Sequence, residues 1–291
     1  MIVTKLIGGL GNQMFQYAAG KALACKHNTE LKVDVSELNQ SSEDRYTQRH
    51  YELDIFASDI EIAKNTDILP FFNKDNGKIK REFQRRFPFL FNTLHAVESG
   101  NNYHPEFKKY PKNAYLRGFW QSELYFKEYE IEIRKDFQFK QSVIEACKPL
   151  INKIAPINTV SLHVRRGDYV NNPSANKFHG LCSPQYYEQA VSYISKSQKH
   201  IEVVVFSDDT AWCKENLKFD VPIHFLETGS AYEDMYLMSH CKHNVIANSS
   251  FSWWGAWLNN NRNKIVVAPQ KWFADTSVNT SDIIPASWIK L

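Results

Sequence analysis

The sequence has few cysteines, little net charge and no long apolar run. Its five cysteines are an odd number at wide spacings and form no CxxC pair, which indicates unpaired thiols in a reducing compartment. The formal net charge of +3 is too small to argue for nucleic acid. No apolar stretch approaches the length of a membrane helix, and Gly8, Gly9 and Gly11 interrupt the first one, so it is no signal peptide. We expect a cytoplasmic globular protein.

Several ligand patterns are also missing. No Asp-x-Asp triplet occurs, because Asp208-Asp209 is a plain pair. His240, Cys241 and His243 lack the spacing of metal ligands. The glycine run near the N-terminus is not closed by Lys-Ser or Lys-Thr, which excludes a P-loop. We therefore expect no metal site.

The octapeptide 163–170, HVRRGDYV, places charge at the end of a strand. It follows the apolar stretch 158–162, so His163, Arg165, Arg166 and Asp168 lie where open α/β sheets bind ligands. Adjacent arginines are poor core residues, and a target with several anionic oxygens, such as a diphosphate, satisfies their donors. An ordinary ion-pair cluster is the alternative.

A glycine loop follows the first expected strand. Residues 8–18, GGLGNQMFQYA, give a strand, a loop and a helix, the layout that aims backbone N–H groups at an anion. Gly9 and Gly11 let the backbone approach a ligand. The run lacks the third glycine of a dinucleotide fingerprint, although Asp34 lies at the distance of its acidic residue. A tight turn without a ligand is the third alternative.

A third motif comes late in the chain, at residues 248–258, NSSFSWWGAWL. Asn248, Ser249 and Ser250 follow a short apolar strand and offer polar groups and helix N–H groups to phosphate oxygens. Ser and Asn are also ordinary N-caps, which is the competing interpretation. We interpret the tryptophans that follow as core residues rather than a binding platform: Trp253, Trp254 and Trp257.

The periodicity predicts an α/β fold in two halves. In the first, strands are expected near 2–7, 31–35 and 114–119, with helices near 11–27, 121–136 and 141–153. Residues 40–112 read as an irregular insertion. The second half alternates strictly, which implies a parallel sheet. Its strands are expected near 157–164, 201–207, 221–226, 243–247 and 264–268, and its helices near 184–197, 210–217, 231–241 and 252–260.

The three motifs together resemble the α-1,2-fucosyltransferase family, glycosyltransferase family 11. Segments 178–190, 205–209 and 233–241 are also similar, so the resemblance runs from about residue 1 to about 275. It implies a GT-B-like fold, with two Rossmann-like domains facing across a cleft: residues 1–155 on the acceptor side and 156–291 binding the donor. Golgi relatives carry a membrane anchor, and its absence suggests a cytoplasmic bacterial enzyme or a trimmed chain.

The resemblance implies transfer of L-fucose from GDP-β-L-fucose to the 2-hydroxyl of a terminal β-galactoside, with inversion. Bacterial members act in O-antigen or capsule biosynthesis. As the C1–O bond breaks, charge builds on the diphosphate, and arginines offset it where a metal-binding Asp-x-Asp triplet is missing. We therefore expect no cofactor and no metal requirement. The acceptor is an oligosaccharide that is often lipid-linked in bacteria.

Residue roles follow from the same resemblance. At least one of Arg165 and Arg166 is expected on the β-phosphate. Asp234 is expected to accept from guanine, which offers N1–H and N2–H. Asp168 is expected on the ribose or on an arginine. The other donor contacts are expected from Gly9, Gly11, Asn12, His163, Asn248, Ser249 and Ser250.

The catalytic base stays open. The related α-1,6 enzymes carry a glutamate shortly after their arginines, where this chain has Asn171, Asn172 and Pro173. His179 follows on the same loop and titrates near neutrality, so it is a candidate, with a structural or donor-binding role as the alternative.

Alternatives of other classes remain at this stage. They are a fucosyltransferase of another linkage or a protein O-fucosyltransferase, an NAD-type oxidoreductase, and a non-catalytic glycan-binding protein. The basic and aromatic stretch 78–91 reads as an amphipathic helix with its phenylalanines in the core, or as a patch for peripheral contact with the inner membrane.

Overall fold

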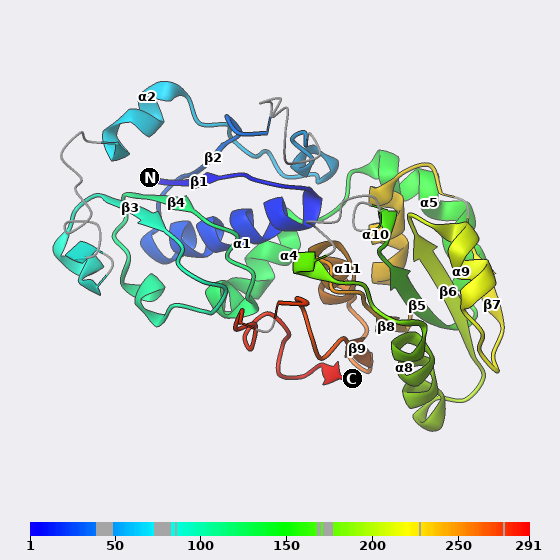
Figure 1. Ribbon diagram of the computed structural model, residues 1–291. Coiled ribbons are helices and arrows are strands. Elements are labelled where there is room, and N and C mark those ends of the chain that lie inside the picture. Colours follow the sequence, from blue (N-terminus) through cyan, green and yellow to red (C-terminus); the bar gives the residue numbers. More distant parts are fainter. Residues whose placement is uncertain are drawn as a thin grey trace. The chain divides into compact units, whose positions relative to one another are not determined.

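The computed structural model of the chain is an α/β structure in which every paired strand runs parallel to its neighbours (Figure 1). The α/β class expected from the sequence is confirmed. The structure describes residues 1–38, 49–72, 83–84, 86–167, 170, 177–226, 228–275 and 277–291.

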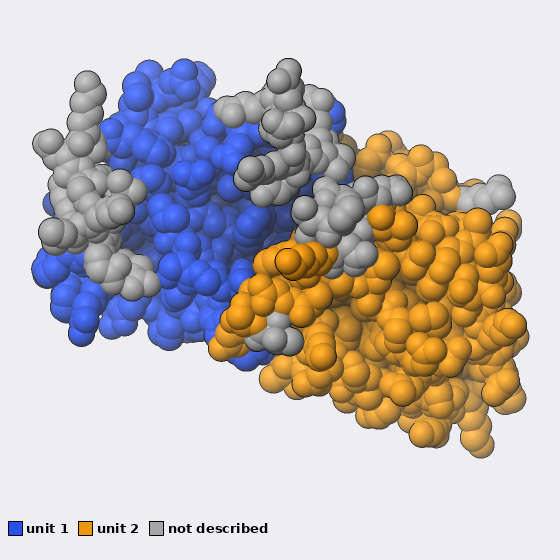
Figure 2. Space-filling model, in the orientation of Figure 1, with its two compact units in different colours: residues 1–138, 281–283 blue, residues 139–280, 284–291 orange. Residues whose placement is uncertain are grey.

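Contacts divide the chain into two compact units (Figure 2). Unit 1 consists of Met1–Gln138 together with Ser281–Ile283, and unit 2 of Phe139–Thr280 together with Ile284–Leu291. By these contacts the division falls after Gln138. The functional roles expected for the halves 1–155 and 156–291 stay predictions.

Unit 1 contains a four-stranded sheet in the order β2-β1-β4-β3. Its strands are β1 (Ile2–Lys5), β2 (Leu31–Asp34), β3 (Leu94–Val97) and β4 (Ala114–Arg117). β3 lies inside the stretch 40–112 that we read as an irregular insertion, so that interpretation was wrong there. This edge strand has only four residues, too few for a clear period in the sequence.

Helix α1 (Leu10–His27) packs along this sheet (Figure 1). It approaches closely because Gly20 has no side chain: a Cβ there would lie 2.8 Å from Leu31 and 3.2 Å from Thr4. The helix ends at Asn28, which adopts the left-handed conformation at φ 46° and donates its N–H to the last carbonyls. The helix predicted for 11–27 is confirmed.

The helix expected over 121–136 is only partly present. Two 3₁₀ turns, η5 (Glu123–Tyr125) and η6 (Lys127–Tyr129), precede α4 (Glu130–Asp136). Ser122 accepts the N–H of Leu124, and Phe126 leaves the helical region at φ −135°, which breaks the ladder. The remaining short elements of unit 1 are η1 (Leu53–Ile55), α2 (Asn65–Ile68), η2 (Leu69–Phe71), η3 (Pro88–Leu90) and η4 (Pro105–Lys109).

Part of the stretch 78–91 lies outside the described residues. Where the structure describes it, Phe83 is 48% exposed and Phe89 58%, and η3 replaces the expected amphipathic helix at residues 88–90. The interpretation that its phenylalanines lie in the core is therefore wrong for these two. Pro88 begins η3 and explains the break, because its ring fixes φ and removes a donor.

Unit 2 contains a six-stranded sheet in the order β10-β9-β8-β5-β6-β7. The strands are β5 (Asn158–Val164), β6 (Ile201–Ser207), β7 (Ile223–Phe225), β8 (His243–Val245), β9 (Val266–Ala268) and β10 (Ile289–Lys290). The helices are α5 (Gln141–Ile154), α8 (Pro184–Ser197), α9 (Thr210–Asn216), α10 (Ala231–His240) and α11 (Ser250–Leu258). The predicted alternation is confirmed; the two-residue β10 was not predicted.

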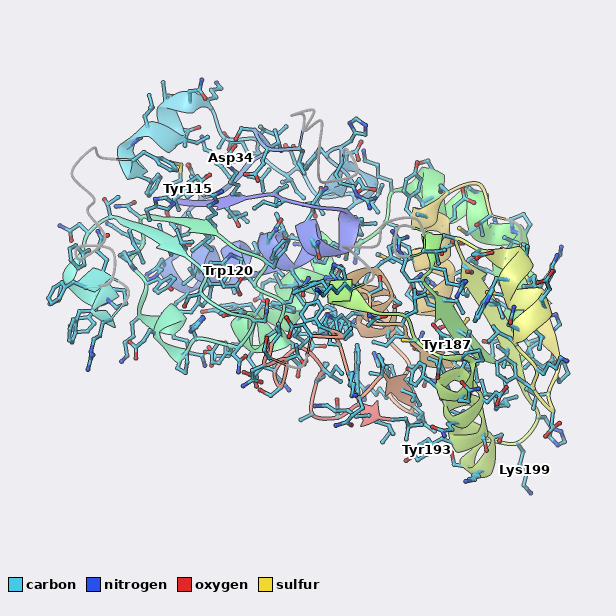
Figure 3. The ribbon with its side chains drawn as sticks, viewed as in Figure 1. Asp34, Tyr115, Trp120, Tyr187, Tyr193 and Lys199 are labelled. Carbon is cyan, nitrogen blue, oxygen red and sulfur yellow. The ribbon has the colours of Figure 1, made fainter. Side chains whose placement is uncertain are left out.

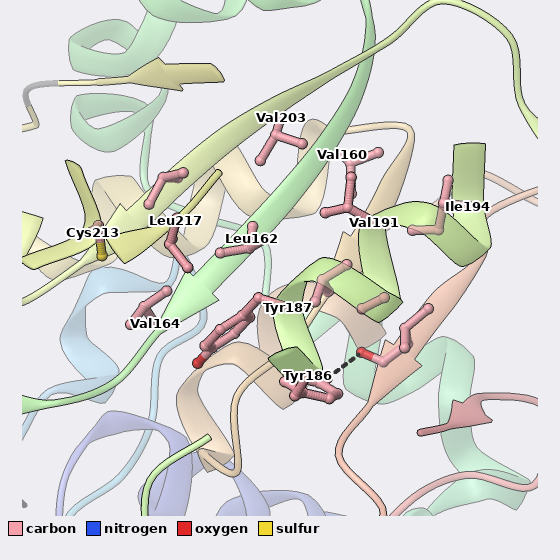
Figure 4. Close-up of a cluster of buried hydrophobic side chains, with 14 of the residues drawn as sticks. Val160, Leu162, Val164, Tyr186, Tyr187, Val191, Ile194, Val203, Cys213 and Leu217 are labelled. Carbon is pink, nitrogen blue, oxygen red and sulfur yellow. Dashed lines mark hydrogen bonds between the residues drawn. The ribbon is translucent and has the colours of Figure 1, made fainter. Parts of the chain in front are cut away.

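The core of unit 2 forms between β5, β6 and α8 (Figure 4). Tyr186 on α8 is buried among these residues, and its hydroxyl donates to the carbonyls of Ile246 and Val267 at 2.7 and 3.2 Å. The helix is thereby tied to the segment after β8 and to β9. Trp253 and Trp254 are fully buried and Trp257 is 4% exposed, which confirms that they are core residues.

Candidate functional site

Two charged pairs meet at the carboxyl edge of the unit 2 sheet. β5 and β6 pair in parallel, with Val164 opposite Ser207. Arg165 and Arg166 directly follow β5, and Asp208 and Asp209 directly follow β6. Strand register alone therefore brings two cations to two anions.

Each arginine is held by a carboxylate. The Arg165 Nη1 lies 3.0 Å from Asp208 Oδ2, and the Arg166 Nε donates to Asp209 Oδ2 at 3.1 Å. The backbone N–H of Arg166 also donates to Asp208 Oδ1 at 2.8 Å. The arginine side chains are only 26% and 17% exposed, so the pairs are partly shielded from water.

Arg166 is fixed on a further side by an aromatic ring. Its guanidinium lies 3.9 Å from the Trp212 ring centroid, a cation–π contact. Asp209 is the N-cap of α9 and accepts the N–H of Trp212, and this hydrogen bond, followed by Arg166, lowers the pKa of Asp209. In the part of the chain that the structure describes, Arg166 binds the two aspartates through its Nε and its backbone N–H.

Sequence reasoning missed Asp208 and Asp209 as partners of the arginines and named Asp168 instead. Asp168 lies outside the described residues, so its expected contact stays a prediction. The signal was present in the sequence: two strands that pair in parallel, each followed at once by a doubly charged dipeptide. Without the register of β5 against β6, the sequence does not say which aspartate pairs with which arginine.

His163 lies on β5, two residues before Arg165, and is buried. Burial, with a smaller contribution from the Arg165 charge, lowers the pKa of His163 to about 3, so the imidazole is neutral. Its ring packs on Phe251 at 5.5 Å, and its Nδ1 has no hydrogen-bond partner among the described residues. The expected guanine contact stays a prediction.

Asn248 clamps the loop that carries His179. Its amide donates to the carbonyls of His179, Gly180 and Trp272 at 2.9, 3.3 and 3.2 Å, and its oxygen lies 3.5 Å from the Cys182 sulfur. The side chain is 5% exposed. In this structure the amide serves the loop, and the donor contact expected of it stays a prediction.

The two serines after Asn248 begin α11. Ser249 is the N-cap residue, but its side chain makes no cap hydrogen bond. Both serines are half-buried. A hydroxyl at a helix N-terminus is well placed for an anion, which keeps the prediction for Ser249 and Ser250 open.

His179 belongs to an aromatic cluster with Phe178 and Phe273, at ring distances of 5.0 and 5.5 Å. Burial lowers the pKa of His179, so its ring is neutral at pH 7. A neutral imidazole is in the protonation state that a base needs. The catalytic assignment itself stays a prediction.

Asp234 lies in the first turn of α10 and accepts the hydroxyl of Thr228 at 2.6 Å. Burial raises the pKa of Asp234 to about 6. A half-buried carboxylate with one hydrogen-bond donor from the protein retains lone pairs for further donors. This suits the expected guanine contact.

In unit 1, the side chains of two glutamines hold the glycine loop by hydrogen bonds to the main chain. Gln13 donates to the carbonyls of Gly8 and His50 and accepts the N–H of Glu52. Gln16 accepts the N–H of Ile7 at 2.9 Å and donates back to its carbonyl. Both side chains are fully buried. Sequence reasoning did not assign them a role, although two glutamines on the inner face of a helix are an unusual signal.

The loop leaves little room around Asn12. Gly8 has φ +79°, and a Cβ there would lie 2.6 Å from the Asn12 amide nitrogen. Gln121 donates to the Asn12 oxygen at 2.8 Å. Gly9 is the N-cap of α1, and the carboxylate of Glu52 accepts the N–H of Leu10. An internal acid therefore already lies at this helix terminus.

Asp34, the acid of the dinucleotide alternative, is engaged within unit 1 (Figure 3). It is 3% exposed and accepts the Tyr115 hydroxyl at 2.6 Å and the Ser36 N–H at 2.9 Å. A ribose would have to displace these bonds. This arrangement does not favour the NAD-type alternative.

In the part of the chain that the structure describes, no three His, Cys, Asp or Glu side chains gather as metal ligands. Over the same residues, no helix combines the length and the apolar character needed to cross a bilayer. All five cysteines are free thiols.

The comparison with protein families decides the class. The model of glycosyl transferase family 11 matches residues 1–291. The chain belongs to this family. The resemblance noted from the three motifs is confirmed, and glycosyl transfer is favoured over the oxidoreductase and glycan-binding alternatives.

Relatives agree with this membership, and a solved structure agrees with the fold. This family 11 glycosyltransferase is 39% identical to the O-antigen biosynthesis glycosyltransferase WbnK of Escherichia coli, over 98% of this chain and 99% of the relative. It is 37% identical to an Escherichia coli alpha-1,2-colitosyltransferase, over 100% and 99%. A structure of an Arabidopsis thaliana FUT1 mutant in complex with GDP matches with a TM-score of 0.55 at 13% identity, over 92% of this chain and 70% of that one. The predicted GT-B-like class is confirmed.

The clamp role of Asn248 predicts a loss of stability on charge introduction. Asn248→Asp replaces the amide donors with a carboxylate that faces three carbonyl oxygens. We expect the free energy of unfolding at pH 8 to fall by about 3 kcal/mol or more, measured by urea denaturation. Ser249→Ala is the matched control, and we expect a change within about 0.5 kcal/mol. Equal losses in the two variants would contradict the clamp.

Proposed function

We propose that this glycosyltransferase transfers L-fucose from GDP-β-L-fucose to the 2-hydroxyl of a terminal β-galactoside, with inversion and without a divalent metal. The observation that carries the proposal is the arginine pair held by Asp208 and Asp209 at the carboxyl edge of the unit 2 sheet. Membership in a family of glycosyltransferases with O-antigen relatives supports the substrate class and a place in O-antigen or capsule biosynthesis.

The chemistry follows from charge. When the acceptor hydroxyl oxygen attacks C1 of the donor sugar, the C1–O bond breaks and its electron pair goes to the diphosphate. The hydroxyl proton passes to a base, for which His179 is the candidate. Two guanidinium groups stabilise that charge through hydrogen bonds that strengthen in the transition state. Asp208 and Asp209 fix the guanidiniums beforehand, so little reorganisation is needed during the reaction. The chain has no Asp-x-Asp triplet to hold a metal for the same purpose.

Ser249 and Ser250, the glycine loop and Asp234 supply the other contacts in this proposal. Serine hydroxyls and the first N–H groups of α11 receive phosphate oxygens. Asn12 and the Gly9 and Gly11 amides contact the diphosphate or the transferred sugar.

A colitosyl donor is the second candidate, favoured by the 37% identity with an alpha-1,2-colitosyltransferase over the whole chain. Colitose differs from fucose by lacking the 3-hydroxyl. A site that hydrogen-bonds this hydroxyl rejects the deoxy donor strongly, whereas a site that makes no such bond tolerates both. The ratio of kcat/KM for the two donors therefore separates the candidates.

The test of function is a transfer assay with GDP-fucose, GDP-colitose and a β-galactoside, with and without EDTA. We expect α-(1→2)-linked product, identified by NMR, from GDP-fucose at an unchanged rate in EDTA. Activity that EDTA abolishes and Mg²⁺ or Mn²⁺ restores would overturn the metal-free mechanism. If only GDP-colitose gave product, GDP-colitose would replace GDP-fucose as the proposed donor. If neither donor gave product, the proposal would be overturned.

The role of Asp234 predicts opposite effects on binding and stability. Its pKa is raised from 3.8 to about 6 in the fold, so ionisation costs native stability as pH rises through 6. Asp234→Asn carries no proton to lose. Above pH 6 we expect its free energy of unfolding, measured by urea denaturation, to exceed that of the parent by up to about 3 kcal/mol. Below pH 4 this difference should vanish.

The same variant should bind GDP more weakly, because an amide offers guanine only one acceptor oxygen. In the parent, GDP affinity measured by calorimetry should fall as pH drops through 6, and in the variant it should not. Asp220→Asn, on an exposed residue, is the control and should change neither property. Normal GDP affinity in Asp234→Asn would remove the guanine assignment.

The acceptor is proposed to be lipid-linked, with peripheral contact at the inner membrane through residues 78–91. Phe83, Phe89 and Leu90 are exposed by 48, 58 and 60%, and the stretch carries five basic residues in the sequence. Exposed aromatics next to lysines and arginines are typical of an interfacial patch. Flotation with anionic liposomes should carry the protein upward, and Phe89→Ser should reduce this; no flotation of the parent would contradict the contact.

A further inference from the structure

A carboxylate with no assigned role lies at the carboxyl edge of the unit 1 sheet. Glu98 directly follows β3, and the β3–β4 register places Val97 opposite Arg117, so Glu98 faces the turn that follows β4. Its Oε2 accepts the N–H of Phe119 at 2.6 Å, and the N–H of Trp120 lies 3.1 and 3.0 Å from Oε1 and Oε2. Both of its oxygens therefore bind main-chain donors of one turn.

The turn is shaped to receive this side chain. A Cβ on Gly118 would lie 2.3 Å from the Glu98 Cβ and 2.6 Å from its Oε2. No side chain fits at this position while Glu98 keeps its place. The glycine and the glutamate are thus a matched pair across two strands.

Trp120 adopts a backbone conformation that bulky residues rarely take. Its φ is +53°, and its side chain, which is labelled in Figure 3, is fully buried. Its ring packs on Phe107 at 5.5 Å and on Tyr125 at 5.3 Å. A strained conformation persists only when its surroundings hold it, and such positions cluster at functional sites. Here the two oxygens of Glu98 hold the N–H of the strained residue.

The residues on either side of Trp120 connect the turn to the glycine loop or are exposed. Gln121 donates to the Asn12 oxygen of the glycine loop at 2.8 Å. Phe119 is 40% exposed and makes no ring contact with another described residue. Ser122 anchors the far end of the turn by donating to the carbonyl of Asp282 at 2.7 Å. One turn, held by Glu98 at one end and by Ser122 at the other, therefore carries both an exposed aromatic residue and an amide that contacts the glycine loop.

We propose that the turn Gly118–Gln121 binds the acceptor sugar, with Phe119 as the ring that contacts it, and that Glu98 is the positioning residue that holds this turn. The inference rests on the proposed function. A pyranoside offers an apolar face of C–H groups and a rim of hydroxyls. An aromatic ring covers the first, and amides such as Gln121 and Asn12 bind the second.

The state of Glu98 gives the proposal a pH signature. Burial raises the pKa of Glu98 to about 7, although the two N–H donors act in the opposite direction. Only the carboxylate has two acceptor oxygens, so protonation weakens its hold on the turn as pH falls through 7. Of the neighbouring groups, Tyr125 stays neutral because burial raises its pKa, and the Glu98 charge adds to this. His104 binds the Ser99 carbonyl, and Arg117 pairs with Glu37.

The experiment measures acceptor KM, kcat and GDP affinity from pH 5.5 to 8.5 in the parent and five variants. Glu98→Gln leaves one acceptor oxygen and places an NH₂ group, which is itself a donor, next to the backbone N–H groups of the turn. Gly118→Ala expels Glu98 without changing any charge. For both variants we expect acceptor KM at pH 8 to rise about 10-fold or more, with GDP affinity within about twofold of the parent.

Phe119→Ala should raise acceptor KM alike, and Phe119→Tyr should restore it. In the parent, acceptor KM should rise as pH falls through 7, and in Glu98→Gln it should not change with pH. Glu106→Gln, which alters an exposed ion pair on η4, is the control and should match the parent throughout.

An unchanged acceptor KM in Gly118→Ala or Phe119→Ala would overturn the proposal. So would a collapse of kcat at constant acceptor KM in Glu98→Gln, because that pattern belongs to a group that takes the acceptor proton. Loss of GDP affinity together with acceptor affinity would identify a merely structural role. If the parent itself transfers no sugar, the proposed function fails, which is a distinct result from a parent that is active while its variants are unaffected.

Discussion

The pairing of β5 with β6 is the constraint on which the candidate donor site depends. It places Arg165 and Arg166 beside Asp208 and Asp209, at the edge of a parallel sheet where α/β proteins bind ligands. A lone arginine pair would repel and be mobile. The two carboxylates neutralise the pair and fix its direction, and the Trp212 ring supports Arg166 from the side. The result is a pair of guanidinium groups fixed in place within one unit.

In unit 1, too, polar side chains fix the groups at the carboxyl edge of the sheet, and most of these side chains are amides. The glycine loop is not held by its glycines alone. Gln13 and Gln16, buried on the inner face of α1, bind the main chain of Gly8 and Ile7. Gln121 reaches Asn12 from the turn that Glu98 holds. Buried amides and the carboxylates of Glu52 and Glu98 thus satisfy main-chain groups at the carboxyl edge of this sheet.

The sequence predicts what is local. Strand, glycine loop and helix at 2–27 follow from periodicity, as does the alternation of unit 2, because each depends on residues a few positions apart. The four-residue edge strand β3 was missed because no period can develop over so short a stretch. The helix expected at 121–136 fails because Ser122 and Phe126 favour separate turns, which a count of apolar positions does not register.

What the sequence did not predict is the partner of each charged side chain. Asp208 and Asp209 meet the arginines, and Glu98 meets the Trp120 backbone, only through the register of strands whose paired residues are twenty or more positions apart. Asn248 shows the reverse case: a polar residue in a motif, read as a donor ligand, uses its amide on three carbonyls of a loop.

The most direct test of the central claim is a comparison of GDP with GMP binding, by calorimetry, in the parent, Arg165→Ala, Arg166→Ala and the exposed-site control Arg262→Ala. If the arginines bind the β-phosphate, at least one of the first two variants should lose about tenfold or more in GDP affinity while GMP affinity changes by less than about twofold. Equal losses for the two nucleotides, or no loss in either variant, would contradict the account.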